Sequence, residues 1–118
     1  PILNDQMVQA LRQQTREVHV SPELQAYIVS LAAYTRGHPR VRLGASPRAS
    51  LGLMRAARAH GLLAGRDFAL PDDVRALAPT TFAHRLVLTP EAELDGFSGL
   101  DVVREALEKV PYRGPADR

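Results

Sequence analysis

The chain has 118 residues, a hydrophobic fraction of 45% and a formal net charge of +2, which suits one globular domain and excludes a disordered chain. It contains no cysteine, so disulfides, thiol catalysis and thiolate metal sites are excluded. Its apolar runs are far shorter than the roughly 20 residues of a membrane-spanning helix. Residues 1–5 also lack the basic start and apolar stretch of a signal peptide. We therefore expect a cytoplasmic protein without a membrane span and, since the sequence opens on Pro1, a longer parent chain.

The first part of the sequence predicts two helices. Asn4 is a suitable N-cap for a helix with apolar residues at positions 7, 8 and 11, which ends before residue 18. The second helix has a clearer start, because Ser21 is an N-cap and Pro22 takes the first helical position. Apolar residues then recur at helical spacing. Gly37, followed by Pro39, ends this helix.

A loop over residues 36–45 leads to a third predicted helix. Ser46 caps this helix and Pro47 takes its first position. Small apolar residues at positions 49, 53, 56 and 57 form a face suited to close helix packing. Gly61 and Gly65 mark the exit from the helix.

The fourth predicted helix begins at Pro71 with two carboxylates, Asp72 and Asp73. We interpret this acidic pair as a complement to the positive end of the helix rather than as a metal site. Leu70 is a poor N-cap for this helix. Pro79 is expected to break or kink it.

The last third predicts a further turn near residues 81–85, an extended piece at 86–88 and a fifth helix. Ser98 and Asp101 form a weak capping box at the start of that helix, and Pro111 stops it. Together the patterns predict an all-α domain over residues 1–110. Its architecture is a small bundle of about five helices with at most a trace of extended chain. We expect residues 111–118 to be a flexible C-terminal tail.

Motifs for catalysis and metal binding are absent from the sequence. There is no G-x-x-x-x-G-K-[ST] loop to hold a triphosphate, no H-E-x-x-H and no G-x-S-x-G. The four histidines lie too far apart in the chain for a local metal site, and we interpret them as surface or partly buried residues: His19, His38, His60 and His84. We therefore predict no catalytic residue and no metal site in this chain.

Arg48 lies on the first turn of the third predicted helix, shortly after Gly44. An arginine is unfavourable at the positive end of a helix, so its placement calls for a reason. One reason is the presentation of a bidentate donor to a phosphate; the alternative is a solvated side chain. Arg55 and Arg58 fall within about 80° of Arg48 around the helix. This basic stripe either binds an anion or is a solvated face.

Residues 44–50, Gly-Ala-Ser-Pro-Arg-Ala-Ser, resemble the segment that carries the sensor 2 arginine in the lid of MoxR-family AAA+ ATPases. Further blocks resemble the rest of that lid in the same order: residues 18–21 and 27–29, then 65–68 and 71–74, then 78–79, 84–86 and 89–93. The resemblance covers nearly the whole chain. One departure is Leu70, which stands where the family usually has a capping Thr or Ser.

The resemblance implies a lid domain that closes over ATP bound to a core domain absent from this chain. By position, Arg48 is the sensor 2 arginine that reaches the γ-phosphate, and Pro47 contacts the nucleotide beside it. ATP and Mg²⁺ belong to the full-length parent, an ATPase, whereas the fragment is inactive and holds no cofactor.

The resemblance also implies how the parent assembles and what it does. The family forms ring oligomers, typically hexamers, with a chaperone-like role in remodeling and maturation. The expected partners are the protein's own AAA+ core domain, neighbouring subunits and proteins with von Willebrand factor A domains.

Two other functions follow from the residues alone. A nucleic-acid-binding helical domain is suggested by the isoelectric point near 9.5. However, a net charge of +2 is small for binding along a phosphate backbone, so we predict no nucleic-acid partner. A helical protein-interaction module is the second alternative, and it would need no exposed arginine at a helix start.

Overall fold

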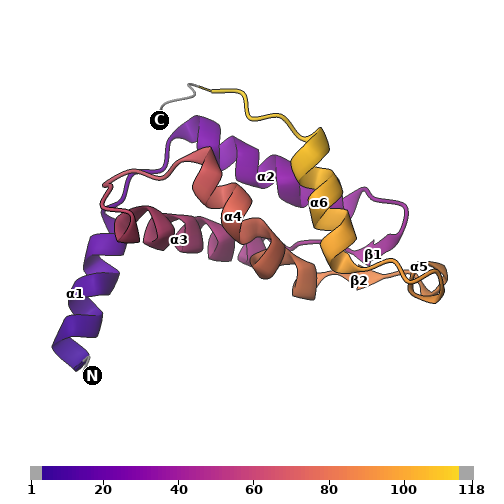
Figure 1. The fold of residues 1–118 in the computed structure, drawn as a ribbon, viewed down its shortest axis with the longest axis horizontal. Helices are drawn as coiled ribbons and strands as arrows, with labels where there is room; N and C mark the ends of the chain where they lie inside the picture. The colour runs from indigo at the N-terminus through magenta and orange to yellow at the C-terminus, as the bar shows by residue number, and fades with distance from the viewer. Residues whose placement is uncertain (1–3, 115–118) are drawn as a thin grey trace.

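The computed structural model describes residues 4–114. Figure 1 shows a helical bundle with a small two-stranded sheet near one end. The elements in chain order are α1 (Asp5–Arg16), α2 (Pro22–Arg36), β1 (Val41–Leu43), α3 (Pro47–Leu63), α4 (Pro71–Phe82), the 3-10 turn η1 (Ala83–Arg85), β2 (Val87–Leu88), α5 (Pro90–Leu94) and α6 (Gly99–Lys109). The prediction of an all-α bundle with a trace of extended chain is confirmed.

Side-chain caps begin most of these helices. In each case a side-chain oxygen accepts a hydrogen bond from a backbone N–H three residues later, which satisfies one of the unpaired amides of the first turn. These caps are Asn4, Ser21, Ser46, Thr89 and Ser98. The helix starts predicted at residues 4, 21, 46 and 98 are therefore confirmed.

The core lies where α3 packs against α2 and α4, and where α6 packs against α2 and α4. Its fully buried large side chains include Leu31 from α2, Leu53 from α3, Phe82 from α4 and Val103 from α6. Of the four α3 residues predicted to face the core, Ala49, Leu53 and Ala57 are completely buried, whereas Ala56 is only half-buried. Small side chains allow the neighbouring helices to approach α3 closely.

Pro79 does not break its helix, which corrects the first of the two outcomes predicted for it, a break or a kink. Helix α4 continues through Pro79 to Phe82. A proline removes one backbone hydrogen bond from a helix, but here Ala78 and Phe82 on either side of it are buried in the core. Burial of these side chains outweighs the loss and keeps the last turn helical.

The extended piece predicted at residues 86–88 is confirmed as strand β2, and its partner lies within the segment predicted as a loop. Strand β1 pairs with β2 in antiparallel fashion, with Val41 opposite Leu88. The sequence also missed α5, the five-residue helix that Thr89 caps. Val41 and Leu88 bury a second apolar cluster with Ala92 and Val102.

The two ends of the described chain differ in how they pack. Helix α1 projects from the bundle (Figure 1), contacts α3 and has no buried residue. At the other end, the ring of Tyr112 meets Tyr27 edge-on at 5.7 Å between centroids. The flexible tail was predicted over residues 111–118, of which 115–118 lie outside the described residues.

Between residues 4 and 114, every helix is too short or too polar to cross a bilayer.

Candidate functional site

The loop before α3 is held against the end of α2 by buried hydrogen bonds. The hydroxyl of Thr35 accepts from the backbone N–H of Ala45 at 2.9 Å and donates to the carbonyl of Ala32 at 2.6 Å. The guanidinium of Arg36 donates to the carbonyl of Ala45 at 2.6 Å. Thr35 and Ala45 are both fully buried. The residue directly before the Ser46 cap is therefore fixed on both its amide and its carbonyl side.

Gly44 allows the close approach that these hydrogen bonds require. A Cβ atom at this position would lie 2.6 Å from the Cα and from the backbone nitrogen of Arg36. No side chain fits at that distance, so the loop can pack on α2 only with glycine here. Gly44 thus contributes to a rigid start for α3 as well as to the turn before it.

We expect Thr35→Val to lower the free energy of unfolding by about 1–3 kcal/mol, because the buried N–H of Ala45 loses its acceptor. Thr80→Val is a matched control, since the Thr80 hydroxyl is exposed and donates only to Leu77 within its own helix. Urea denaturation of both variants measures the difference. Equal losses in the two variants would contradict the role assigned to Thr35.

Arg48 projects into solvent from the first turn of α3. Its side chain is exposed, and no ion pair within residues 4–114 includes it. Pro47 is exposed beside it, and the Ser46 hydroxyl accepts from the N–H of Ala49 at 3.2 Å. Within the described part of the chain, the structure therefore presents a guanidinium without an ion-pair partner on a rigid helix start. An incoming anion could accept from this group without displacing a partner.

An apolar hollow of about 410 Å³ opens next to this turn, between α2 and α3. Pro47 and Leu51 line it from α3, and Ile28 and Arg36 line it from α2. Its apolar wall lies beside the exposed Arg48 turn, so charge and apolar surface meet at the start of α3.

The other two arginines of the predicted stripe lie along a second groove. Arg55 and Arg58 line a groove between α1 and α3, together with Arg12 and Arg16 of α1. The sequence placed Arg55 and Arg58 on one helix face with Arg48. The sequence did not show that Arg12 and Arg16 of a second helix, α1, lie beside Arg55 and Arg58.

The sequence also missed a buried ionic cluster around Asp73, whose side chain is 1% exposed. Both carboxylate oxygens of Asp73 accept from the guanidinium of Arg66 at 2.8 Å. The carboxylate also bonds the Nδ1 of His60 at 2.6 Å and accepts from the backbone N–H of Leu70 at 2.7 Å. This last bond caps α4 from within, which explains how a helix with the poor cap Leu70 starts cleanly.

Burial by itself would raise the pKa of Asp73, but the hydrogen bonds from Arg66, the Leu70 amide and His60 outweigh it and lower the pKa to about 2. Gly61 makes room for this cluster, since a Cβ there would lie 3.2 Å from Arg66 Nη1 and 3.4 Å from Asp73 Oδ2. The cluster ties the end of α3 to the start of α4. We therefore assign it a structural role at the far end of α3 from Arg48.

A second polar link joins α6 to the end of α2. One oxygen of Glu105 accepts from the hydroxyl of Tyr34 at 3.1 Å and bonds the Nε2 of His38 at 3.0 Å. The hydrogen bond from His38 lowers the pKa of Glu105. The other ring nitrogen of His38 accepts from the backbone N–H of Arg40. Both ring nitrogens of His38 therefore make hydrogen bonds within the fold. The side chain is half-buried, in agreement with its interpretation as a partly buried residue.

Comparison with known families identifies this arrangement. The AAA lid domain model matches residues 33–106, which contain the Arg48 turn, the Asp73 cluster and the small sheet. This match defines the class: the chain belongs to the AAA lid domain family.

Individual relatives narrow the family to the MoxR branch. The chain is 47% identical over 70 residues to the chaperone MoxR1 of Mycobacterium tuberculosis, covering 59% of this chain and 19% of MoxR1. It is 43% identical over 110 residues to YeaC of Bacillus subtilis, covering 92% of this chain and 34% of YeaC. A candidate ATPase from Cytophaga hutchinsonii has the same fold, with a TM-score of 0.89 and 30% identity over 92% of this chain and 36% of that one. The chain is thus the lid domain of a MoxR-family AAA+ ATPase, and it spans about a third of the length of YeaC and of the Cytophaga protein.

Proposed function

We propose that this lid closes over ATP held by a separate core domain and senses the γ-phosphate through Arg48. The observation that supports the proposal is the exposed guanidinium of Arg48, which has no ion-pair partner among residues 4–114 and lies on a rigid helix start. A sensor of this kind must reach a phosphate when the lid closes and release it after hydrolysis. A planar fork of N–H donors suits the oxygens of a phosphate.

Pro47 and the adjacent hollow fit the same proposal. Pro47 lies both on the first turn with Arg48 and on the wall of the apolar hollow. A nucleotide with its γ-phosphate at Arg48 would bring its remaining parts against this turn. We therefore propose that Pro47 contacts the nucleotide.

The core domain would supply everything else that phosphoryl transfer requires. The chain has no P-loop, so the phosphate cradle and the Mg²⁺ site must come from the core. ATP and Mg²⁺ are the cofactors that the AAA+ family implies for the full-length protein. The decisive experiment is to replace Arg48 in the full-length ATPase and to measure hydrolysis and lid stability separately.

The assembly proposed for the parent is a ring, typically a hexamer, in which lids and cores of neighbouring subunits meet. A chaperone-like role is proposed by analogy with MoxR1, whose name describes it as a chaperone. Partners with von Willebrand factor A domains, a cytoplasmic location and the absence of a nucleic-acid partner remain predictions.

The 118-residue chain by itself is expected to show no ATP hydrolysis, because it lacks the P-loop that positions the triphosphate. Phosphate release at increasing protein concentration measures this, with the Arg48→Ala variant as control. Turnover that rises with protein concentration and disappears in Arg48→Ala would contradict the lid assignment.

A further inference from the structure

The groove between α1 and α3 combines an apolar floor with basic walls. It has a volume of about 750 Å³. The apolar part of its lining, here called the floor, comes from both helices: Val8, Leu11, Leu51 and Met54. The basic part of its lining, here called the walls, consists of Arg12 and Arg16 of α1 and of Arg55 and Arg58 of α3. The residues that line it include no acidic side chain.

The arginines of this groove lack acidic partners within residues 4–114. None of the ion pairs in that part of the chain includes Arg12, Arg55 or Arg58. The Nε atom of Arg58 is buried and, among the described residues, has no hydrogen-bond acceptor. A buried donor without an acceptor is costly. The groove therefore favours an occupant that carries both carboxylates and an apolar side chain.

The opposite end of the same molecule carries that combination. We call residues 90–95 the acidic knob: the short helix α5 and the residue after it. Leu94 is 88% exposed at its tip. Glu91 and Glu93 are exposed beside it, and no ion pair in the described part of the chain includes either of them. Asp95 adds a third carboxylate, which lies 3.4 Å from Arg40.

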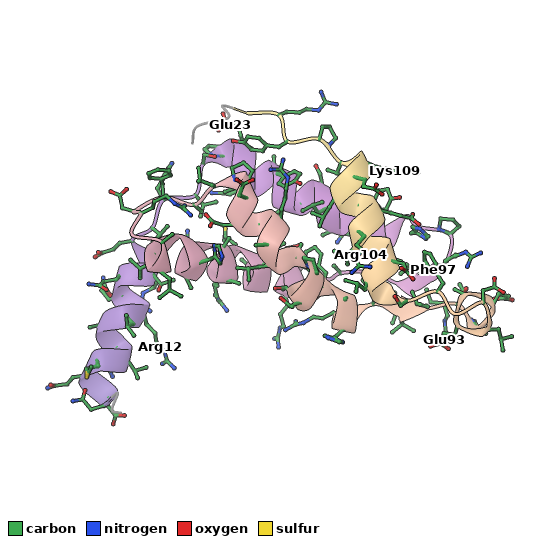
Figure 2. The ribbon with its side chains drawn as sticks, in the orientation of Figure 1. Arg12, Glu23, Glu93, Phe97, Arg104 and Lys109 are labelled. Atoms are coloured by element: carbon green, nitrogen blue, oxygen red, sulfur yellow. The ribbon has the colours of Figure 1, made fainter. Side chains whose placement is uncertain are left out.

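The knob and the groove lie too far apart to meet within one chain. The molecule extends over 48 × 35 × 20 Å. Figure 2 shows Arg12 of the groove and Glu93 of the knob near opposite ends of its long axis. When two different, complementary surfaces of one chain bind each other in separate copies, the contact is head-to-tail, and repeated contacts of this kind build rings or open chains of subunits.

We propose that the acidic knob of one lid docks into the basic groove of a second copy of this chain. Leu94 inserts between the apolar side chains of the floor, while Glu91 and Glu93 pair with arginines of the walls. The contact is independent of nucleotide and of Arg48. A ring of the proposed ATPase would thereby gain a lid-to-lid contact in addition to those made by its cores.

The first test is self-association of the chain measured by sedimentation equilibrium without nucleotide. A knob this small makes a small interface, so we expect weak association with a Kd on the order of 100 µM. Raising the salt from roughly 0.05 M to 0.5 M should weaken it, because the charge pairs at its rim are screened. Leu94→Ser should abolish it, whereas Leu63→Ser, which changes another exposed leucine outside both surfaces, should leave it unchanged.

A charge exchange tests whether the two surfaces contact each other. One variant carries Glu91→Lys and Glu93→Lys in the knob, and the other carries Arg12→Glu and Arg55→Glu in the groove; all four side chains are exposed. Each variant alone should be monomeric, since like charges then face each other. Mixed in equal amounts, the two should associate, because each knob now meets a groove of opposite charge.

Three results would overturn the proposal. The first is a wild-type chain that remains monomeric up to about 1 mM, well above the expected Kd. The second is association that persists in the groove variant, which would assign it to another surface. The third is a mixture that stays monomeric although circular dichroism shows both variants to be folded. None of these results depends on ATP hydrolysis, so they leave the proposed function of Arg48 to its own test.

Discussion

Replacing Arg48 by alanine in the full-length ATPase is expected to lower the rate of ATP hydrolysis by at least about 10-fold, because a charge-assisted contact to the reacting phosphate is lost. The same change should alter the free energy of unfolding of the lid by less than about 0.5 kcal/mol, since the Arg48 side chain is exposed and unpaired within the described residues. Steady-state turnover and urea denaturation measure the two quantities separately. Arg48→Lys should recover only part of the activity, because an ammonium cannot form the bidentate contact of a guanidinium.

Two further variants separate a single sensor residue from a general loss of positive charge. Arg104→Ala removes another exposed arginine, which lies on α6 (Figure 2) and not on α3, and should leave hydrolysis unchanged. Arg55→Ala removes an arginine of the same stripe as Arg48 and should have a smaller effect than Arg48→Ala. If Arg55→Ala impaired hydrolysis as much, the basic stripe as a whole would be the functional unit. If Arg48→Ala unfolded the lid, the sensor proposal would fail.

Replacing Asp73 by alanine is expected to lower the free energy of unfolding of the chain by about 3–5 kcal/mol. The change leaves the half-buried guanidinium of Arg66 without its bidentate partner, and breaking a buried pair costs this much. It also removes the acceptor for the N–H of Leu70, so α4 loses its internal cap. Asp72→Ala is the matched control, because the neighbouring Asp72 carboxylate is 86% exposed and its one ion pair among the described residues is with Arg75; we expect a loss of about 0.5 kcal/mol or less.

Because the pKa of Asp73 is lowered in the folded chain, the free energy of unfolding should also depend on pH. Its folded pKa of about 2 lies below the value near 4 of an unfolded aspartate. The resulting stabilisation, roughly 2–3 kcal/mol, is fully present above about pH 5 and is lost as the pH falls from about 4 toward 2. Asp73→Asn should flatten the stability profile over this range, while the lowered pKa of Glu105 leaves some acid sensitivity. An unchanged slope in Asp73→Asn would contradict the assignment.

Much of this fold could be predicted from the sequence because its helix starts are local. Ser21, Ser46 and Ser98 each bond an amide three residues further along the chain. Such a contact depends on sequence spacing alone. The candidate sensor followed in the same way, since Arg48 stands two residues after a cap and needs no distant partner to be exposed. The family resemblance then connected that position with a phosphate.

Distant contacts decided the features that the sequence analysis missed or misjudged. Asp73 could be interpreted as helix-end charge, but its burial with Arg66 and His60 depends on how α3 packs against α4. A proline inside a helix favours a break, but α4 continues through Pro79 because the neighbouring side chains are buried in the core.

The sequence by itself determined where every helix except α5 begins, the all-α class and the exposed arginine at the start of α3. The reason is that caps and helical periodicity act over a few residues. Only the tertiary structure decided that strands β1 and β2 pair, that Thr35 holds the loop before α3, and that α1 adds two arginines to those of α3. Each of these features joins segments whose approach depends on the packing of the whole core, and no local pattern encodes that approach.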